Sequence, residues 1–169
     1  MPYPEFNDIE GMMSIEELRW LSNIAKEMDS IVELGCWFGR STHALLTNCR
    51  GIVYAIDPWS PSYIGPRAQE VRKGFFENTK DFKNLVIMEM ESAKAVKAFA
   101  DKSVDMVFVD ADHSQKSVIQ DNALWLPKAR KIICGHDYNP EKHSGVVQAV
   151  DKCYTGRFKL VDTIWYVNL

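Results

Sequence analysis

The sequence is 169 residues long, with 46% hydrophobic and 25% charged residues, which is typical of one ordinary globular domain. Its formal net charge of −3 argues against strong electrostatic attraction to nucleic acid or to anionic lipid. No stretch approaches the roughly 18 uninterrupted apolar residues of a membrane span, and residues 1–11 lack the basic flank and apolar run of a secretory signal.

Helical and strand periodicities alternate along the chain. In chain order, the patterns predict a helix at 14–28, a strand at 31–36, a helix at 40–48, a strand at 52–57, a helix at 67–80, a strand at 85–90, a helix at 92–100, a strand at 104–111, a helix at 115–126, a strand at 131–138, a helix at 145–154 and two short strands joined by a tight turn at 157–169. Ser14 and Glu17 are spaced as a capping box at the start of the first helix. The prolines, serines and glycine of residues 58–66 predict a long loop with no regular element, which is either part of a site or a plain surface connection.

This alternation predicts an α/β fold. Strands that alternate with helices imply βαβ units, a parallel sheet and helices on both of its faces. Right-handed crossovers then give a doubly wound architecture. We expect a single domain over residues 1–169, with an N-terminal helical segment at 1–30 and a core at 31–169. The closing hairpin is unusual for a dinucleotide-binding domain.

The four cysteines are far apart and include no CxxC pair; they are Cys36, Cys49, Cys134 and Cys153. Such spacing is typical neither of a zinc site nor of a disulfide framework. We interpret all four as reduced thiols and expect a cytoplasmic protein.

The glycine turn in residues 31–42, IVELGCWFGRST, is expected to face the ligand, because open α/β sheets bind ligands beyond the carboxyl ends of their strands. A pyrophosphate fingerprint, GxGxxG, would need glycine at three positions where the sequence has Gly35, Trp37 and Arg40. A phosphate loop fails as well, because Arg40 stands where its second glycine belongs. Asp57 ends the second predicted strand and is well placed to accept both hydroxyls of a ribose. The pattern therefore predicts a nucleoside ligand without a pyrophosphate.

Glu33, Gly35 and Gly39 form the pattern ExGxxxG, and Asp57 follows it. This arrangement resembles the class I S-adenosylmethionine-dependent methyltransferases. The chain is also similar to the branch that contains macrocin O-methyltransferases and cephalosporin hydroxylases, on the strength of VFVDADHS at 107–114, CGHDY at 134–138 and GVVQAVD at 145–151. The resemblance covers nearly the whole chain. It implies a Rossmann-like methyltransferase fold with a mostly parallel, seven-stranded sheet and a C-terminal antiparallel hairpin.

The resemblance also implies an S-adenosylmethionine site. Its cofactor-binding residues would be Glu33, Gly35, Cys36, Gly39, Ser41, Thr42, Asp57, Pro58, Trp59, Glu91, Ser92 and Asp110. Glu33 and Gly35 would contact the methionine end of the cofactor. Ser41 and Thr42, at a helix start, would hydrogen-bond its carboxylate. Asp57 would hold the ribose, and the residues after the second and third strands would line the adenosine.

Three polar residues at the ends of the fourth and fifth strands, Asp110, His136 and Asp137, are expected within reach of one divalent ion. In related metal-dependent O-methyltransferases, acidic residues at these places bind magnesium, which holds and acidifies a substrate hydroxyl before it attacks the sulfonium methyl in line. His136 departs from that pattern, because imidazole suits manganese, iron or zinc better than magnesium. The other interpretation is that His136 and Asp137 only line the pocket.

His113 is the candidate base, because an imidazole pKa of about 6.5 suits proton transfer near neutrality. Asp112 is its rival, Asp110 completes the catalytic set, and a capping role at the next helix is the alternative for His113. His143 is a substrate-side candidate, whereas His43 lies within a helix and is expected to be packed or exposed.

We therefore predict a methyltransferase that acts on a hydroxyl of a small molecule such as a sugar or glycoside, with magnesium or manganese. The chain has little spare length for a substrate-capping domain, so loops or a second subunit of a homodimer would bind the acceptor. The alternatives are a metal-dependent hydroxylase-like relative, a non-catalytic S-adenosylmethionine-binding protein, and an NAD-linked reductase, against which Trp37 argues. A nucleic-acid substrate is disfavoured, because the fourth strand ends in VDADH and no basic stripe is visible.

Overall fold

The computed structural model describes residues 8–169. Residues 1–7 lie outside the described part; they include the start of the 1–30 segment and most of the stretch expected not to be a secretory signal. The strands are β1 (Ser30–Leu34), β2 (Ile52–Ile56), β3 (Leu85–Met88), β4 (Val104–Val109), β5 (Ala129–Gly135), β6 (Lys159–Val161) and β7 (Ile164–Asn168). The helices are α1 (Ile15–Ala25), α2 (Arg40–Asn48), α3 (Pro61–Ile64), α4 (Ala68–Thr79), α5 (Ser92–Ala95), α6 (Gln115–Trp125) and α7 (Ser144–Tyr154), with 3-10 turns η2 (Gly65–Arg67) and η3 (Val96–Ala98).

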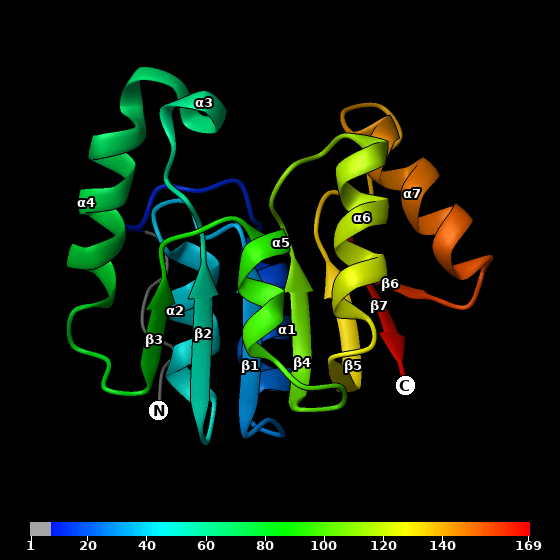
Figure 1. Cartoon of the computed structure of the whole chain (residues 1–169), viewed down its shortest axis with the longest axis horizontal. Coiled ribbons are helices and arrows are strands. Elements are labelled where there is room, and N and C mark those ends of the chain that lie inside the picture. The colour runs from blue at the N-terminus through cyan, green and yellow to red at the C-terminus, as the bar shows by residue number, and fades with distance from the viewer. Residues whose placement is uncertain (1–7) are drawn as a thin grey trace.

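The strands of the described residues form one sheet in the order β3-β2-β1-β4-β5-β7-β6 (Figure 1). Strands β1 to β5 run parallel, β7 pairs antiparallel with β5, and β6 pairs antiparallel with β7. This confirms the predicted mostly parallel, doubly wound sheet with a C-terminal antiparallel hairpin. Leu34 pairs with both Ile56 and Val109, so β1, β2 and β4 end side by side at one edge of the sheet.

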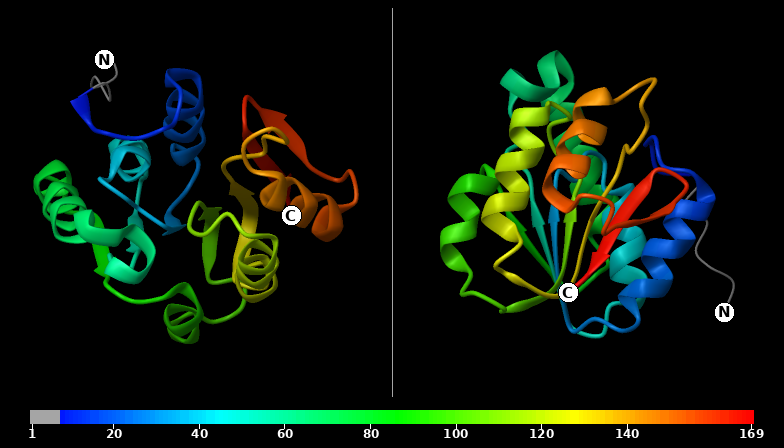
Figure 2. Two further views of the ribbon diagram at one scale, coloured as in Figure 1. Left: turned by 90° about the horizontal axis from the view of Figure 1, so that it is seen from above. Right: turned by 90° about the vertical axis from the view of Figure 1, so that its right-hand side faces the viewer.

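Helices cover both faces of the sheet, as Figure 2 shows. On one face, Leu21 of α1 and Leu45 of α2 pack with Phe108 of β4. On the other face, Val118 of α6 packs with Val107, the neighbour of Phe108 in the same strand. Successive strand residues point to opposite faces, and both faces are covered. Every residue of β4 is therefore buried, which explains why its sequence is a nearly continuous apolar run.

The segment 58–66 is not the irregular loop that its prolines and glycine predicted. It contains α3 and runs into η2, so that prediction was wrong. Ser60 is the N-cap of α3, where its hydroxyl accepts a hydrogen bond from the Ser62 amide, and Pro61 occupies the first helical position. Serine followed by proline is a helix-start signal, and here it outweighs the general tendency of proline to break structure.

The strands that lead into the site end earlier than predicted. The first was expected to end at Cys36 and ends at Leu34, because Gly35 turns the chain away with a φ of +81°. The fifth was expected to end at Tyr138 and ends at Gly135, and Asp137 follows with a φ of +64°. The helix expected at 92–100 is reduced to α5 and η3. The polar residues of the site therefore lie on loops.

None of the helices within residues 8–169 combines the length and the apolar character that crossing a lipid bilayer requires.

Candidate active site

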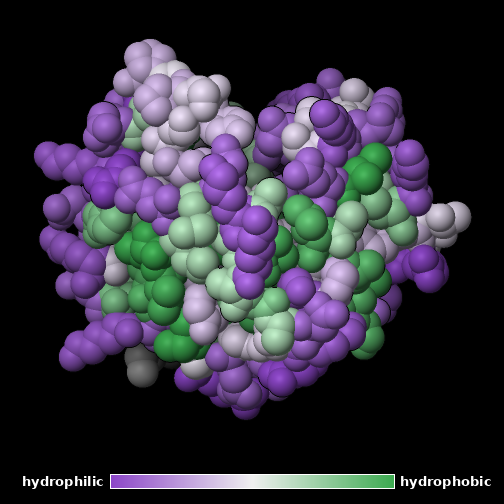
Figure 3. All heavy atoms as spheres, viewed as in Figure 1, coloured by the Kyte–Doolittle hydropathy of each residue, from purple (hydrophilic) through white to green (hydrophobic). Residues whose placement is uncertain are grey.

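A cavity of about 480 Å³ opens beyond the carboxyl ends of β1, β2 and β4. Figure 3 shows the surface hollowed at this edge, between the side of the molecule formed by α3 and α4 and the side formed by α6 and α7. Open α/β sheets bind ligands at this edge, and the volume lies within the usual range for small-molecule sites, roughly 300–1,000 Å³.

The glycine turn after β1 forms the floor of the cavity, where Gly35 is packed directly against the loop after β4. A Cβ atom on Gly35 would lie 2.2 Å from the backbone oxygen of Asp110. Its φ of +81° is also a conformation that only glycine adopts without strain. Gly39, with a φ of +87°, then starts α2. The first glycine is therefore required by close backbone approach as well as by the turn.

Asp57 lines the cavity, but its carboxylate is already engaged in holding the site together. One oxygen accepts hydrogen bonds from the amides of Cys36 (2.8 Å) and Trp37 (3.3 Å), and the other accepts one from the amide of Trp59 (2.7 Å). Burial raises the pKa of Asp57, and these amides oppose that shift. Asp57 thus ties the glycine turn to the loop after β2, with lone pairs left for a ligand.

Of the two tryptophans of these loops, Trp37 faces the site as expected and Trp59 does not. Trp37 lines the cavity and is 38% exposed, whereas Trp59 is buried against Phe75 and is not part of the cavity wall formed by the described residues. The indole nitrogen of Trp59 donates to the backbone oxygen of Trp37 at 3.1 Å. Trp37 is therefore the aromatic wall of the site, and Trp59 supports it. Pro58 lines the cavity as expected.

Five expected cofactor contacts, Glu33, Cys36, Gly39, Ser41 and Thr42, are buried and do not belong to the described cavity wall. The Thr42 hydroxyl donates to one oxygen of Glu33, and the other oxygen, Oε1, has no hydrogen-bond partner within residues 8–169. Burial raises the pKa of Glu33 to about 8, against the effect of the Ser41 and Thr42 hydroxyls. Glu33 therefore holds a proton at neutral pH and anchors the start of α2.

Glu91 and Ser92 line the opposite part of the cavity, as expected. The Ser92 hydroxyl donates to Oδ1 of Asp121 at 2.6 Å. The sequence reasoning missed Asp121, which lies on α6 with two other lining residues, Ser117 and Gln120. Spacings of three and four residues place such side chains on one face of a helix. The helix has polar residues at 115–117 and again at 120–122, so its sequence contained no distinct signal that would have found them.

Asp110, His136 and Asp137 lie together beside the cavity, as their positions at neighbouring strand ends predicted. Nδ1 of His136 is 3.3 Å from a carboxylate oxygen of Asp137 and 3.7 Å from one of Asp110. Nε2 of His136 pairs with Glu17 at 3.2 Å. A carboxylate on the far nitrogen is the usual way in which a metal-ligating histidine is oriented, so this donor set fits a divalent ion.

Glu17 is a second residue whose part in the site the sequence did not predict. Its capping box with Ser14 is confirmed, but its other oxygen also accepts hydrogen bonds from the amide and hydroxyl of Thr163. Burial acts to raise the pKa of Glu17, yet His136 and Thr163 lower it to about 2. For His136 the signs are reversed. Burial acts to lower its pKa, but Asp110, Asp137 and Glu17 raise it to about 12.

His113 also contacts this group. Its Nε2 is 2.9 Å from Oδ2 of Asp137 and 3.9 Å from Asp110, and these two carboxylates raise its pKa to about 10. His113 therefore carries a proton near neutrality, unlike the free imidazole assumed from the sequence. The cap of α6 is Ser114, so the capping alternative for His113 is wrong.

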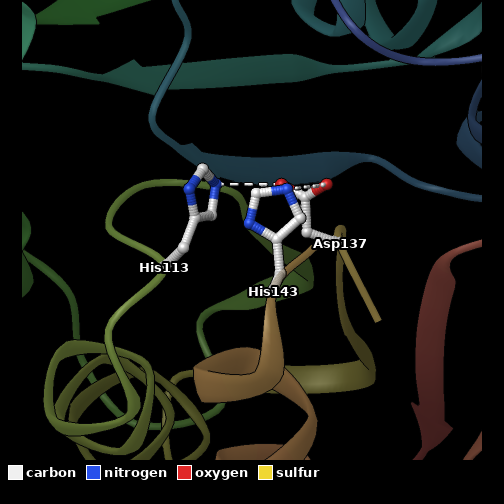
Figure 4. A group of neighbouring side chains, drawn as sticks. All are labelled: His113, Asp137 and His143. Atoms are coloured by element: carbon white, nitrogen blue, oxygen red, sulfur yellow. Dashed lines mark ion pairs between the residues drawn. The ribbon is translucent and has the colours of Figure 1, made fainter. Parts of the chain in front are cut away.

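Asp112, the rival base, accepts a hydrogen bond from the amide of Ser114 at 2.7 Å. The hydroxyl of Ser114, together with this amide, lowers the pKa of Asp112. His143 contacts Asp137 at 3.4 Å, and Figure 4 shows both His113 and His143 turned toward this carboxylate. The fourth histidine, His43, lies on α2 and packs edge-on against Phe82.

Comparisons with known proteins agree with this fold. A family model described as a methyltransferase domain matches residues 32–138. No curated protein matches the sequence. Several solved structures share the fold. The O-methyltransferase TomG of Streptomyces achromogenes, involved in tomaymycin synthesis and solved with S-adenosylmethionine, is 14% identical, with a TM-score of 0.70 over 94% of this chain and 81% of that one.

Two further structures were solved with S-adenosylhomocysteine. An O-methyltransferase of Bacillus cereus is 15% identical, with a TM-score of 0.69 over 94% of this chain and 83% of that one. The methyltransferase PaMTH1 of Podospora anserina is 18% identical, with a TM-score of 0.66 over 92% of this chain and 78% of that one. At such identities the likeness shows a common fold.

Proposed function

Because the chain belongs to the methyltransferase-domain family, we propose that it transfers the methyl group of S-adenosylmethionine to a hydroxyl of a small molecule such as a sugar or glycoside. The observation that carries the proposal is the position of the cavity. It lies between the glycine turn, which suits a nucleoside cofactor, and the Asp110 loop, beside which lies a set of oxygen and nitrogen donors suited to activating a hydroxyl.

The cofactor part of the proposal is supported by the shape of the glycine turn. Trp37 lines the cavity at the position where a dinucleotide-binding turn has glycine, so a pyrophosphate cannot approach the backbone there. Asp57 is expected to accept the ribose hydroxyls through its remaining lone pairs. Glu91 and Ser92 are expected near the adenine, with Asp121 behind Ser92. Solved relatives of this fold were crystallised with S-adenosylmethionine or S-adenosylhomocysteine.

The metal part of the proposal is supported by the donor chemistry of Asp110, His136 and Asp137. Two carboxylates and an imidazole held by Glu17 make a set that suits manganese better than magnesium, because magnesium prefers oxygen ligands alone. When bound there, a divalent ion supplies a Lewis acid that lowers the pKa of the acceptor hydroxyl.

In the reaction, the acceptor oxygen forms a bond to the methyl carbon while the carbon–sulfur bond of the cofactor breaks, leaving S-adenosylhomocysteine. The hydroxyl proton must leave as well. His113 is the only histidine among the described residues that line the cavity, and its Nε2 is the atom proposed to accept that proton. It can do so only when its pairing with Asp110 and Asp137 is weakened, because that pairing keeps it protonated. Asp112 is the alternative acceptor.

The surroundings of the enzyme also belong to the proposal. The four cysteines are free thiols, and three of them are buried. This is consistent with a reducing compartment, and we propose the cytoplasm. The acceptor would be bound by loops around the cavity or by a second copy of the chain; the homodimer stays a prediction.

The test is an assay of S-adenosylhomocysteine release from S-adenosylmethionine with pools of sugars, glycosides and phenols, with and without Mn²⁺. We expect acceptor-dependent release that falls about 100-fold or more in Asp110→Asn, with an unchanged urea midpoint. Asp101→Asn is the matched control, because Asp101 is exposed and pairs only with Lys128 among the described residues. Wild-type turnover in Asp110→Asn would contradict the proposed role of Asp110. Cofactor binding without release for any pool would favour the non-catalytic binding protein.

A further inference from the structure

We propose that His113, Asp137 and His143 form a binding site for a first-row divalent transition-metal ion such as Zn²⁺, which shares Asp137 with the neighbouring Asp110–His136–Asp137 set. An ion bound here occupies Nε2 of His113, so Asp112 would then be the acceptor of the hydroxyl proton. The three side chains come from the loop before α6, the loop after β5 and the start of α7. The inference stands on their own geometry and does not require methyl transfer.

The distances between the donor atoms match those around one ion. Nε2 of His113 lies 2.9 Å from Oδ2 of Asp137, and Nε2 of His143 lies 3.4 Å from Oδ1. All three donor atoms lie within 4.8 Å of one another. Ligands about 2.1 Å from a tetrahedral zinc ion lie about 3.4 Å apart, so the two distances to Asp137 fit and the two imidazole nitrogens must approach each other by up to about 1.4 Å. Figure 4 shows both imidazoles next to the carboxylate of Asp137, with dashed lines for the two ion pairs.

The conformation of the backbone around Asp137 brings these side chains together. Asp137 itself has a φ of +64°, a strained conformation for a residue that is not glycine. Asn139 then turns the chain back: its side-chain oxygen accepts hydrogen bonds from the amides of Glu141 and Lys142, and its backbone oxygen accepts one from His143. The turn thereby returns His143 to the carboxylate six positions earlier.

Gly145 allows the second histidine to come close. A Cβ atom at this position would lie 2.6 Å from the backbone oxygen of His113. The start of α7 therefore rests directly on the loop before α6, and the two imidazole rings lie with centroids 4.6 Å apart. The packing of the backbone at Gly145 thus brings the two histidines close together.

The chemistry of the group favours a transition metal. Two imidazoles and one carboxylate are preferred by zinc, iron and cobalt over magnesium. The N-termini of α6 and α7 disfavour a nearby cation, but Asp110 and Glu17 lie in the same cluster as Asp137, and three carboxylates outweigh them. His113 also lines the cavity, which leaves an open side for a further ligand.

The experiment is titration of the full-length, chelator-treated protein with Co²⁺, followed by its visible absorption, and with Zn²⁺, followed by calorimetry. We expect one strong site per chain and an imidazole-type cobalt spectrum. His143→Gln should weaken binding by about 10-fold or more. It should fold normally, because His143 makes no side-chain capping bond at α7. His113→Gln should give the same result, and His43→Gln is the matched control.

Asp110→Asn separates this inference from the proposed function. It removes a ligand of the neighbouring set, so it should abolish methyl transfer but leave the cobalt spectrum unchanged. The cobalt affinity should fall by only about 3-fold, because one nearby negative charge is lost. Wild-type affinity in His143→Gln, or equal losses in His143→Gln and His43→Gln, would overturn the inference. So would loss of the spectrum in Asp110→Asn alone, because the ion would then belong to the neighbouring set.

Discussion

Gly35 holds the two strand-end loops of the site closer together than any side chain would permit. Gly35→Ala places a methyl group 2.2 Å from a backbone oxygen in a left-handed conformation. We expect a loss of about 3 kcal/mol or more in the free energy of unfolding, measured by urea denaturation. Gly156→Ala is the matched control, because Gly156 has a φ of +74° but nothing within 4 Å. It should lose only about 1 kcal/mol.

Equal losses in these two variants would mean that strain in φ alone explains the effect. The close contact between Gly35 and the Asp110 loop would then have no energetic weight, and the account of the cavity floor would be wrong.

Because of Glu33, the free energy of unfolding should fall as the pH rises. Burial, with Asp110 adding to it, raises its pKa to about 8 in the folded protein, from about 4.3 in an unfolded chain. A group whose folded pKa is raised contributes stability that is complete below the unfolded pKa and is lost as the pH rises through the folded pKa. The wild-type protein should therefore lose stability between pH 5 and pH 8, and Glu33→Gln, which does not titrate, should not.

Urea denaturation at pH 5 and pH 8 measures this difference. The free energy of unfolding of Glu33→Gln relative to wild type should rise by roughly 3 kcal/mol between the two pH values. Asp81→Asn, at an exposed position, serves as the control. A constant difference between Glu33→Gln and wild type would show that Glu33 is ionised in the folded protein and stable in that form.

Single residues of the site were predictable where they stand at a strand end. Asp57 and Asp110 line the cavity because the ends of β2 and β4 are aligned with the end of β1. Glu17 was predicted only as a cap, because its pairing with His136 joins residues 119 positions apart and leaves no local signal. Trp59 was wrongly predicted to line the cavity, because its position in the chain does not show which way its side chain points. Its neighbour in the chain, Pro58, does line the cavity, but its own side chain turns into the α4 packing.

At the scale of elements, the pairing of β4 with β5 is held by a buried charge. Asp105 is fully buried at the start of β4, and it pairs with Arg130 at 2.7 Å and Lys131 at 3.3 Å on β5. It also accepts a hydrogen bond from the amide of Asp29. The register between the two strands shifts at this point, between Val104 and Met106. Asp105 therefore fixes the irregular start of the ladder whose other end bears the site.

Asp105→Asn should lower the free energy of unfolding by about 1–3 kcal/mol near neutral pH, because it leaves two cations without their partner. Amides and basic residues lower the pKa of Asp105 against the effect of burial. A depressed pKa contributes stability that is present above the unfolded value and lost as the pH falls through the folded one. The difference from wild type should therefore shrink as the pH falls below about 4.

Chemical denaturation at pH 7 and pH 3 tests this, with Asp101→Asn as the exposed control, for which we expect less than about 0.5 kcal/mol. A difference that stays constant down to pH 3 would mean that the charge of Asp105 does not stabilise the strand pair.

Most elements were predictable because their periodicity is a local property of the chain. The apolar runs of β1, β2 and β4 mark strands covered on both faces, and the capping box marks the start of α1. Their ends were less predictable, because the chain leaves β5 at Gly135 to form the turn around Asp137. The start of α3 carried a serine–proline signal that the surrounding prolines and glycine obscured.

At the scale of the whole molecule, the sheet order follows from alternating strands and helices and from right-handed crossovers. The approach of α7 to α6, which brings His143 to His113, does not follow from any pattern. This approach depends on Gly145 and on tertiary packing, and neither can be inferred from separate sequence motifs. The proximity of Asp110, His136 and Asp137 could be predicted from topology. The proximity of His113 and His143 could not.

The central claim is that the cavity at the ends of β1, β2 and β4 binds S-adenosylmethionine. Calorimetric titration of the purified protein with S-adenosylhomocysteine, and separately with NAD⁺, tests it most directly. The account predicts one S-adenosylhomocysteine bound per chain and no heat with NAD⁺, because Trp37 stands where a pyrophosphate must approach. Binding of NAD⁺, or no binding of S-adenosylhomocysteine, would contradict it.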